Sequence, residues 1–141
     1  MYYKPLFIPL LIQVGLTFAV WLRMYHLRIR EMTAKRIDAQ QVSTRTKGRQ
    51  VLVDSAAAAD NFMNQFEMPV LFYTAIVLAL VLMWQDPVLV ILSWMFVALR
   101  VTHSIIHTTY NHVMHRFWVY IFSCFALLCI WIRLGWFMIS A

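Results

Sequence analysis

Four long runs of apolar residues decide what this chain can fold into. A helix needs about 20 such residues to cross about 30 Å of hydrocarbon. The runs cover approximately residues 5–25, 55–84, 87–111 and 117–138. Of the 141 residues, 62% are hydrophobic, well above the roughly 45–50% of soluble domains. The sequence therefore predicts an all-α bundle of four membrane-spanning helices, in one domain surrounded by a lipid bilayer.

Signals at the ends of the runs also favour helices. Asp54 or Ser55 is suited to cap the second helix, and Asp86 is suited to cap the third, with Pro87 in the first helical turn. Within the second run, Pro69 can bend the helix because the carbonyl of residue 65 loses its partner. We predict no interruption midway along any span.

The loops predict an orientation in the membrane. The hydrophilic loop at residues 26–53, with Arg23 just before it, carries most of the basic side chains, whereas the turn near Asp86 has none. By the positive-inside rule, this loop and the turn before Arg116 are cytoplasmic, and both termini lie on the other side. In a bacterium the membrane would be the inner one. Because topology accounts for the net charge of +6, we expect no nucleic-acid partner.

Two of the runs carry polar side chains that a lipid-facing helix would not. At about 100° per residue, the polar side chains of the second run lie within about 60° of one another around the helix axis, and those of the third run lie within about 40°. They are Asp60, Asn64 and Glu67 in the second run, and Arg100, His107 and Asn111, flanked by His103 and Tyr110, in the third. Ionisable groups in a membrane usually face a bundle interior or a water-filled cavity. Each of these helices therefore presents one polar stripe.

The two stripes also agree in depth. The helical rise places Glu67 about 25 Å below the non-cytoplasmic end of its helix and Arg100 about 20 Å below the same end of the next. We therefore expect Glu67 to contact Arg100 or His103. A single interhelical hydrogen bond contributes only about 0.6 kcal/mol in membranes, and two polar stripes exceed what such bonding needs. A functional cavity is our first interpretation, and a purely structural network is the alternative.

Three chemistries could use such a cavity. Metal binding is one, because His103 and His107 share a helical face and His112, His115 or Glu67 could add ligands. Proton or ion transport is another, although transporter helices are often interrupted midway. The third is binding of an anionic, peptide-like cofactor, to which arginine offers forked donors.

Two stretches carry a resemblance to a known family. The stretch NQFEMPVLFY in the second run and RVTHSIIHTTYNHVMHR at the end of the third resemble the MAPEG family (membrane-associated proteins in eicosanoid and glutathione metabolism), as a divergent member of the bacterial type. The resemblance implies a homotrimer of four-helix protomers that binds glutathione between neighbouring subunits, near the cytoplasmic face. It further implies a glutathione-dependent transferase or peroxidase acting on small lipophilic substrates.

The resemblance also assigns roles to residues. Arg116 would stabilise the thiolate of glutathione, which is the nucleophile, and His107 would donate a hydrogen bond. The residues that would hold glutathione are Asn64, Glu67, Arg100, His103 and Asn111.

The chain differs from the family pattern at two places. Asp60 stands where the family has an arginine, and a carboxylate there would repel a glutathione carboxylate. His103 and His107 stand where the family has tyrosines. The alternative to an enzyme is therefore a non-enzymatic binding or structural membrane protein, whose polar network only stabilises the bundle.

Overall fold

The computed structural model describes residues 4–140 and confirms an all-α fold. Its elements are α1 (Lys4–Lys35), the 3-10 helix η1 (Ala39–Val42), α2 (Arg45–Val51), α3 (Ala56–Asn64), α4 (Met68–Val81), α5 (Pro87–Thr108) and α6 (Val113–Ser140). No strand occurs among the described residues. Four stretches are long and apolar enough to cross a membrane, namely α1, α3 together with α4, α5, and α6.

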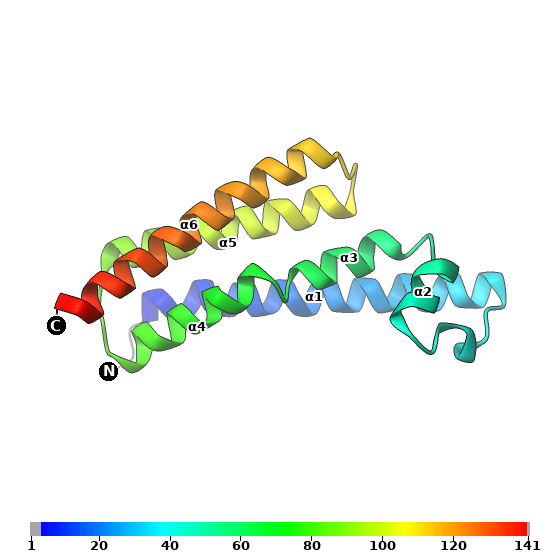
Figure 1. The fold of residues 1–141 in the computed structure, drawn as a ribbon, viewed down its shortest axis with the longest axis horizontal. Coiled ribbons are helices and arrows are strands. Elements are labelled where there is room, and N and C mark those ends of the chain that lie inside the picture. Colours follow the sequence, from blue (N-terminus) through cyan, green and yellow to red (C-terminus); the bar gives the residue numbers. More distant parts are fainter. Residues whose placement is uncertain (1–3, 141) are drawn as a thin grey trace.

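The helices run up and down and form two layers. Figure 1 shows α5 and α6 side by side, with α1 running along α3 and α4 beneath them. The segment with η1 and α2 lies at the same end as the α5–α6 turn, and we call this the loop end. The start of α1, the α4–α5 turn and the finish of α6 lie together at the opposite end, which we call the terminal end.

Helix α1 extends beyond the predicted span into the loop end. Its 32 residues correspond to about 48 Å, against about 30 Å of hydrocarbon. In the extension, the buried Glu31 carboxylate accepts hydrogen bonds from the backbone N–H of Ser55 at 2.9 Å, from its hydroxyl at 2.7 Å and from the Asp54 N–H at 3.0 Å. Ser55 occupies the N-cap position of α3 without a side-chain capping bond. Glu31 therefore fastens the start of α3 to α1.

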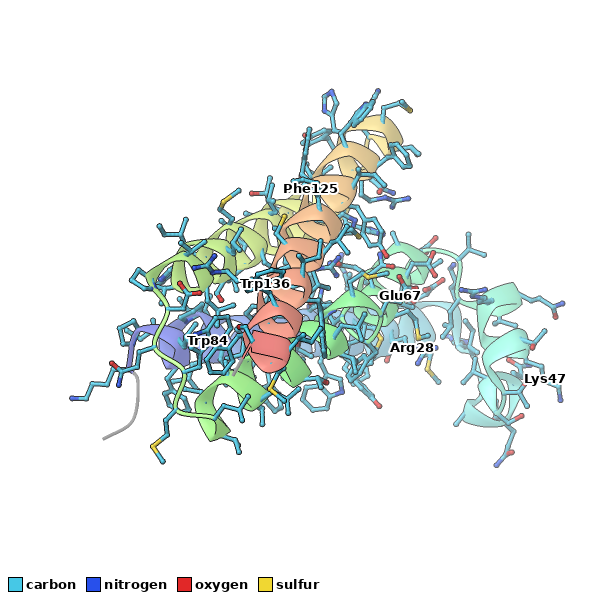
Figure 2. The ribbon with its side chains drawn as sticks, turned by 60° about the vertical axis from the view of Figure 1, so that its left-hand side comes forward. Arg28, Lys47, Glu67, Trp84, Phe125 and Trp136 are labelled. Carbon is cyan, nitrogen blue, oxygen red and sulfur yellow. The ribbon has the colours of Figure 1, made fainter. Side chains whose placement is uncertain are left out.

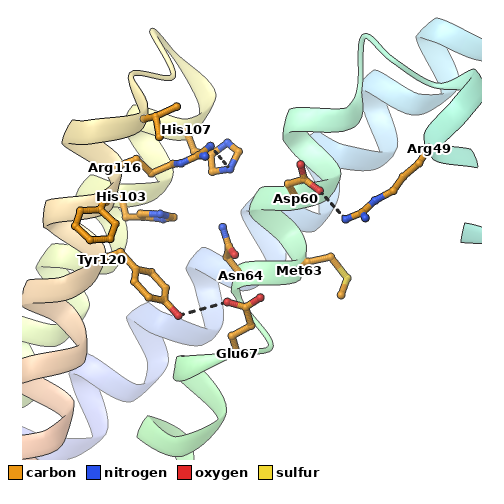
Figure 3. Close-up of a pocket in the computed structure, with 11 residues that line it drawn as sticks. Arg49, Asp60, Met63, Asn64, Glu67, His103, His107, Arg116 and Tyr120 are labelled. Carbon is orange, nitrogen blue, oxygen red and sulfur yellow. Dashed lines mark hydrogen bonds and ion pairs between the residues drawn. The ribbon is translucent and has the colours of Figure 1, made fainter. Parts of the chain in front are cut away.

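The second span is interrupted midway, contrary to our prediction. Helix α3 ends at Asn64 and α4 begins at Met68, with Gln65, Phe66 and Glu67 between them. The cause is partly local, because Pro69 offers no N–H to the carbonyl of Gln65. Part of it comes from another helix, since Arg100 of α5 donates to the Asn64 carbonyl at 2.6 Å. The interruption places Glu67 in an irregular segment that faces the opposite helix pair (Figure 3).

The terminal half of the bundle is packed with apolar side chains. The rings of Phe72 and Phe96 stack with centroids 4.5 Å apart, and those of Trp84 and Phe137 do the same. Asp86 caps α5 as predicted, accepting from the Val88 N–H at 2.9 Å. In Figure 2, Trp84 and Trp136 lie at this end, and Lys47 lies at the far end beyond Glu67.

Candidate functional site

A polar cavity of about 470 Å³ lies between the α3–α4 pair and the α5–α6 pair, toward the loop end (Figure 3). Its lining includes most of the side chains that the sequence predicts for a site. These are Asn64, Glu67, His103, His107 and Arg116, together with Asp60. The remaining lining residues, which the sequence does not identify as site residues, are Arg49, Met63, Val113, Phe117 and Tyr120.

Arg116 is held rigidly at one side of the cavity. Its Nη1 donates to Nε2 of His107 and to Oδ1 of Asn111, both at 2.8 Å. Asn111 can reach it because the residue adopts a positive φ of 46° in the α5–α6 turn, a conformation that asparagine tolerates well. Asn111 thus lies outside the cavity lining and positions Arg116. Within residues 4–140, the Nε and Nη2 groups of this guanidinium donate to no other acceptor.

The bond to Arg116 also fixes the tautomer of His107. A guanidinium can only donate hydrogen bonds, so Nε2 of His107 accepts and, in the neutral ring, Nδ1 carries the proton. Nδ1 is buried and has no partner among the described residues, and the same holds for Nδ1 of His103. Both rings line the cavity, while these two nitrogen atoms are enclosed by protein.

Glu67 and Tyr120 close the cavity on its terminal side. The Tyr120 hydroxyl donates to Oε2 of Glu67 at 3.4 Å, which joins the irregular segment after α3 to α6. Tyr120 lies one helical turn beyond Arg116, so both side chains point from α6 toward the same space. A tyrosine four residues after an arginine in an apolar run is the signal that could have identified it.

Arg100 occupies a different place from the one we expected. Its side chain is fully buried, does not line the cavity, and donates to the Asn64 backbone carbonyl rather than to Glu67. The guanidinium carbon lies 5.7 Å from the Tyr120 ring centroid, within range of a cation–π interaction. Its Nε and Nη1 have no hydrogen-bond partner among the described residues. Arg100 therefore holds the interruption that presents Asn64 and Glu67.

The wall opposite Arg116 carries an ion pair. Asp60 of α3 accepts a hydrogen bond at 3.2 Å from Arg49, whose side chain extends toward it from α2 in the loop (Figure 3). Both side chains are exposed, Arg49 at 73% and Asp60 at 53%. A cation from a distant, hydrophilic part of the chain thus lies beside the carboxylate at the position where the family pattern has arginine.

A second polar network lies beside the cavity and joins three helices. Gln13 of α1 donates to Gln65 at 3.1 Å, Gln65 donates to Ser104 of α5 at 3.1 Å, and Ser104 donates to Asn61 of α3 at 3.2 Å. All four side chains are buried. The glutamine within the first apolar run was the available signal for this network, which binds the helices together.

An apolar cavity of about 440 Å³ follows the polar one along α4 and α6. It is lined by Met68, Leu71, Cys124, Leu127, Leu128 and Trp131. Met68 directly follows Glu67, and Cys124 lies one turn beyond Tyr120. The groove between these two helices therefore changes from polar to apolar within about one turn.

The described residues contain no group of three or more His, Cys, Asp or Glu side chains that could hold a metal ion. The rings of His103 and His107 lie 5.9 Å apart, and Nε2 of His107 is taken by Arg116. The metal-binding alternative therefore has no support from the geometry.

A comparison with protein families matches residues 6–136 to the MAPEG family. No curated protein and no solved structure matches the chain. The matched range reaches into all four apolar stretches and includes every residue of the polar cavity.

Proposed function

The chain belongs to the MAPEG family and is an integral membrane protein with four spanning helices; on that premise, we propose that it is a glutathione-dependent transferase or peroxidase. Its substrate would be a small lipophilic electrophile that arrives through the bilayer. The observation that carries this proposal is the anchored guanidinium of Arg116, which has donors free for a ligand, beside Asn64 and Glu67 in one cavity.

The charges of the cavity fit glutathione. The tripeptide carries two carboxylates and one ammonium group, and the cavity offers the guanidinium groups of Arg49 and Arg116 and the carboxylates of Asp60 and Glu67. A volume of about 470 Å³ is also in the range of about 300–1,000 Å³ that small-molecule sites occupy. The imidazole rings of His103 and His107 complete the polar part of the lining.

Arg116 is the residue that would activate the thiol. When bound, glutathione supplies a thiol whose deprotonated form is the nucleophile. A guanidinium favours a neighbouring thiolate through its charge, and Arg116 can do so without reorganisation because His107 and Asn111 already fix it. In this role His107 is an acceptor that orients Arg116, and Asn111 is its second anchor.

The neighbouring apolar cavity would receive the lipophilic substrate. Its lining is apolar apart from the Cys124 thiol, and it continues the groove between α4 and α6. A substrate dissolved in the bilayer could therefore approach the polar cavity without crossing water. The transition from Glu67 to Met68 marks the boundary between the two parts.

The proposal includes an assembly and an orientation in the membrane. The protein would form a homotrimer, with the loop end in the cytoplasm and both termini on the opposite side, as the basic loop indicates. Large apolar side chains are exposed along every span, among them Phe18, Leu22, Ile91 and Phe125. They would contact lipid or neighbouring subunits.

Calorimetric titration of the detergent-solubilised protein with glutathione tests the proposal. We expect saturable heat and an increase in thermal stability at millimolar glutathione, because a ligand that binds only the folded state stabilises it. If neither occurs, the result favours the alternative function, a structural or non-enzymatic membrane protein. That alternative is favoured by the network of Gln13, Gln65 and Ser104, which needs no ligand.

A further inference from the structure

The ion pair between Arg49 and Asp60 has no role in the thiol activation proposed above. It lies in the cavity wall opposite Arg116, with the Arg49 side chain coming from α2 and the Asp60 side chain from α3 (Figure 3). Neither side chain makes another ion pair among the described residues. Exposed ion pairs contribute little to stability. The fold therefore gains little from this contact.

We infer that the Arg49–Asp60 pair recognises the α-amino-acid end of a peptide ligand, the γ-glutamyl group of glutathione, by exchanging partners with it. This inference rests on the proposed function. The γ-glutamyl end carries an ammonium and a carboxylate on one carbon atom. The two side chains, 3.2 Å apart, offer the opposite charges at a similar separation.

In the exchange, Arg49 releases Asp60 and binds the ligand carboxylate, for which a guanidinium offers two parallel donors. Asp60 then accepts a hydrogen bond from the ligand ammonium. The charge balance is unchanged, because one internal pair is replaced by two pairs with the ligand. Since both side chains are more than half exposed, they can rearrange without disturbing the buried helix contacts.

This reverses the role that the sequence suggested for Asp60. If the Asp60 carboxylate only repels the ligand, neutralising it should raise the ligand affinity. If the carboxylate binds the ligand ammonium, neutralising it should lower the affinity. The two readings therefore predict opposite signs for Asp60→Asn. The substitution retains the size of the side chain and lies on an exposed position, so the protein should still fold.

The test is calorimetric titration of the solubilised full chain with glutathione and with N-acetylglutathione, which lacks the ammonium charge. We expect the wild type to bind the acetylated peptide about tenfold more weakly, from the size of one charge-assisted hydrogen bond. Asp60→Asn should bind glutathione about tenfold more weakly and no longer distinguish the two peptides. Arg49→Ala should weaken the binding of both peptides by a similar factor.

Lys47→Ala is the matched control, because it removes one positive charge from the same helix at a residue outside the cavity lining. It should bind both peptides as the wild type does. Equal or tighter glutathione binding by Asp60→Asn would overturn the inference while leaving the proposed function intact. Loss of thermal stability in Arg49→Ala would also overturn it, by showing a structural pair. A wild type that binds no glutathione would overturn the proposed function, and this inference with it.

Discussion

The two ends of this bundle satisfy their polar groups differently. At the terminal end, the buried Asp86 carboxylate is matched by the Val88 N–H and by an ion pair with Arg133, amid stacked aromatic rings. Toward the loop end, buried atoms of Arg100, His103 and His107 lack partners among the described residues, whereas in the apolar half the indole Nε1 of Trp131 does. Buried polar atoms without partners are rare in folded proteins and call for an explanation. Ionisable side chains with unpartnered buried atoms thus lie toward the loop end, which is the end where we propose that a ligand binds.

The largest effect on activity is expected for the arginine of the cavity. We expect Arg116→Ala to lower kcat/KM for conjugation of a lipophilic electrophile by about a hundredfold, or about 2.7 kcal/mol, because a preorganised charge at the reacting atom is lost. Arg133→Ala is the matched control, since it removes an arginine from the terminal end of the same helix. It should lower stability and leave kcat/KM unchanged. Equal losses of activity in both variants would contradict the claim that only the loop end takes part in the reaction.

The terminal end should respond most to a loss of packing. Phe96 is fully buried against Phe72, and Phe96→Ala should lower the free energy of unfolding by about 3 kcal/mol through the cavity left behind. Ile91→Ala on the same helix, at a side chain that is 59% exposed, should change it by less than about 0.5 kcal/mol. Both values follow from unfolding in mixed detergent. An unchanged stability of Phe96→Ala would show that the terminal end is not the stabilising one.

The ion pair at the terminal end should make stability depend on pH. Burial raises the pKa of Asp86, but hydrogen bonds from Arg133 and the Val88 N–H more than offset this, and the pKa lies below its usual value. Such a carboxylate stabilises the fold above the unfolded pKa of about 4, and the contribution is lost as pH falls through the folded pKa. Asp86→Asn keeps a capping residue but should be about 1 kcal/mol less stable at neutral pH.

The same variant supplies its own control. Below about pH 4 the difference between wild type and Asp86→Asn should shrink, because the wild-type carboxyl becomes protonated. Thermal unfolding at several pH values measures this difference. A difference that stays constant down to acid pH would mean that the charge of Asp86 contributes nothing.

The smallest effect belongs to the network that joins α1, α3 and α5. Gln13→Leu removes its hydrogen bond to Gln65 and should cost about 0.6 kcal/mol, the average for interhelical bonds in membranes. Glutathione affinity should not change, because Gln13 lies outside the cavity lining. A large fall in glutathione affinity would show instead that the binding site extends to α1.

Much of the fold could be predicted from the sequence. The apolar runs identify the four spans because a bilayer allows only helices or closed barrels, and Asp86 with Pro87 marks the start of α5. The interruption after Asn64 could not be predicted in this way. Pro69 alone allows a bend, and the actual break also depends on Arg100, which lies on another helix.

The part of the candidate site that lies on regular helix faces could be predicted from helical periodicity. Asn64, Glu67, His103 and His107 line one cavity as the two stripes predict. Arg100 was misplaced because periodicity gives the face of a helix but not the depth of burial. Arg49 cannot be identified in this way because its position depends on how the hydrophilic loop folds against α3, and its contact with Asp60, 11 residues along the chain, follows no helical period.

The central claim is that the polar end binds glutathione and activates its thiol, and the ultraviolet absorbance of the thiolate tests this most directly. Titrating the solubilised protein with glutathione at increasing pH, we expect thiolate to form in the wild type well below the ordinary thiol pKa of about 8.5. Arg116→Ala should return the transition toward that value. Thiolate that forms only near the ordinary pKa with the wild type would contradict the account.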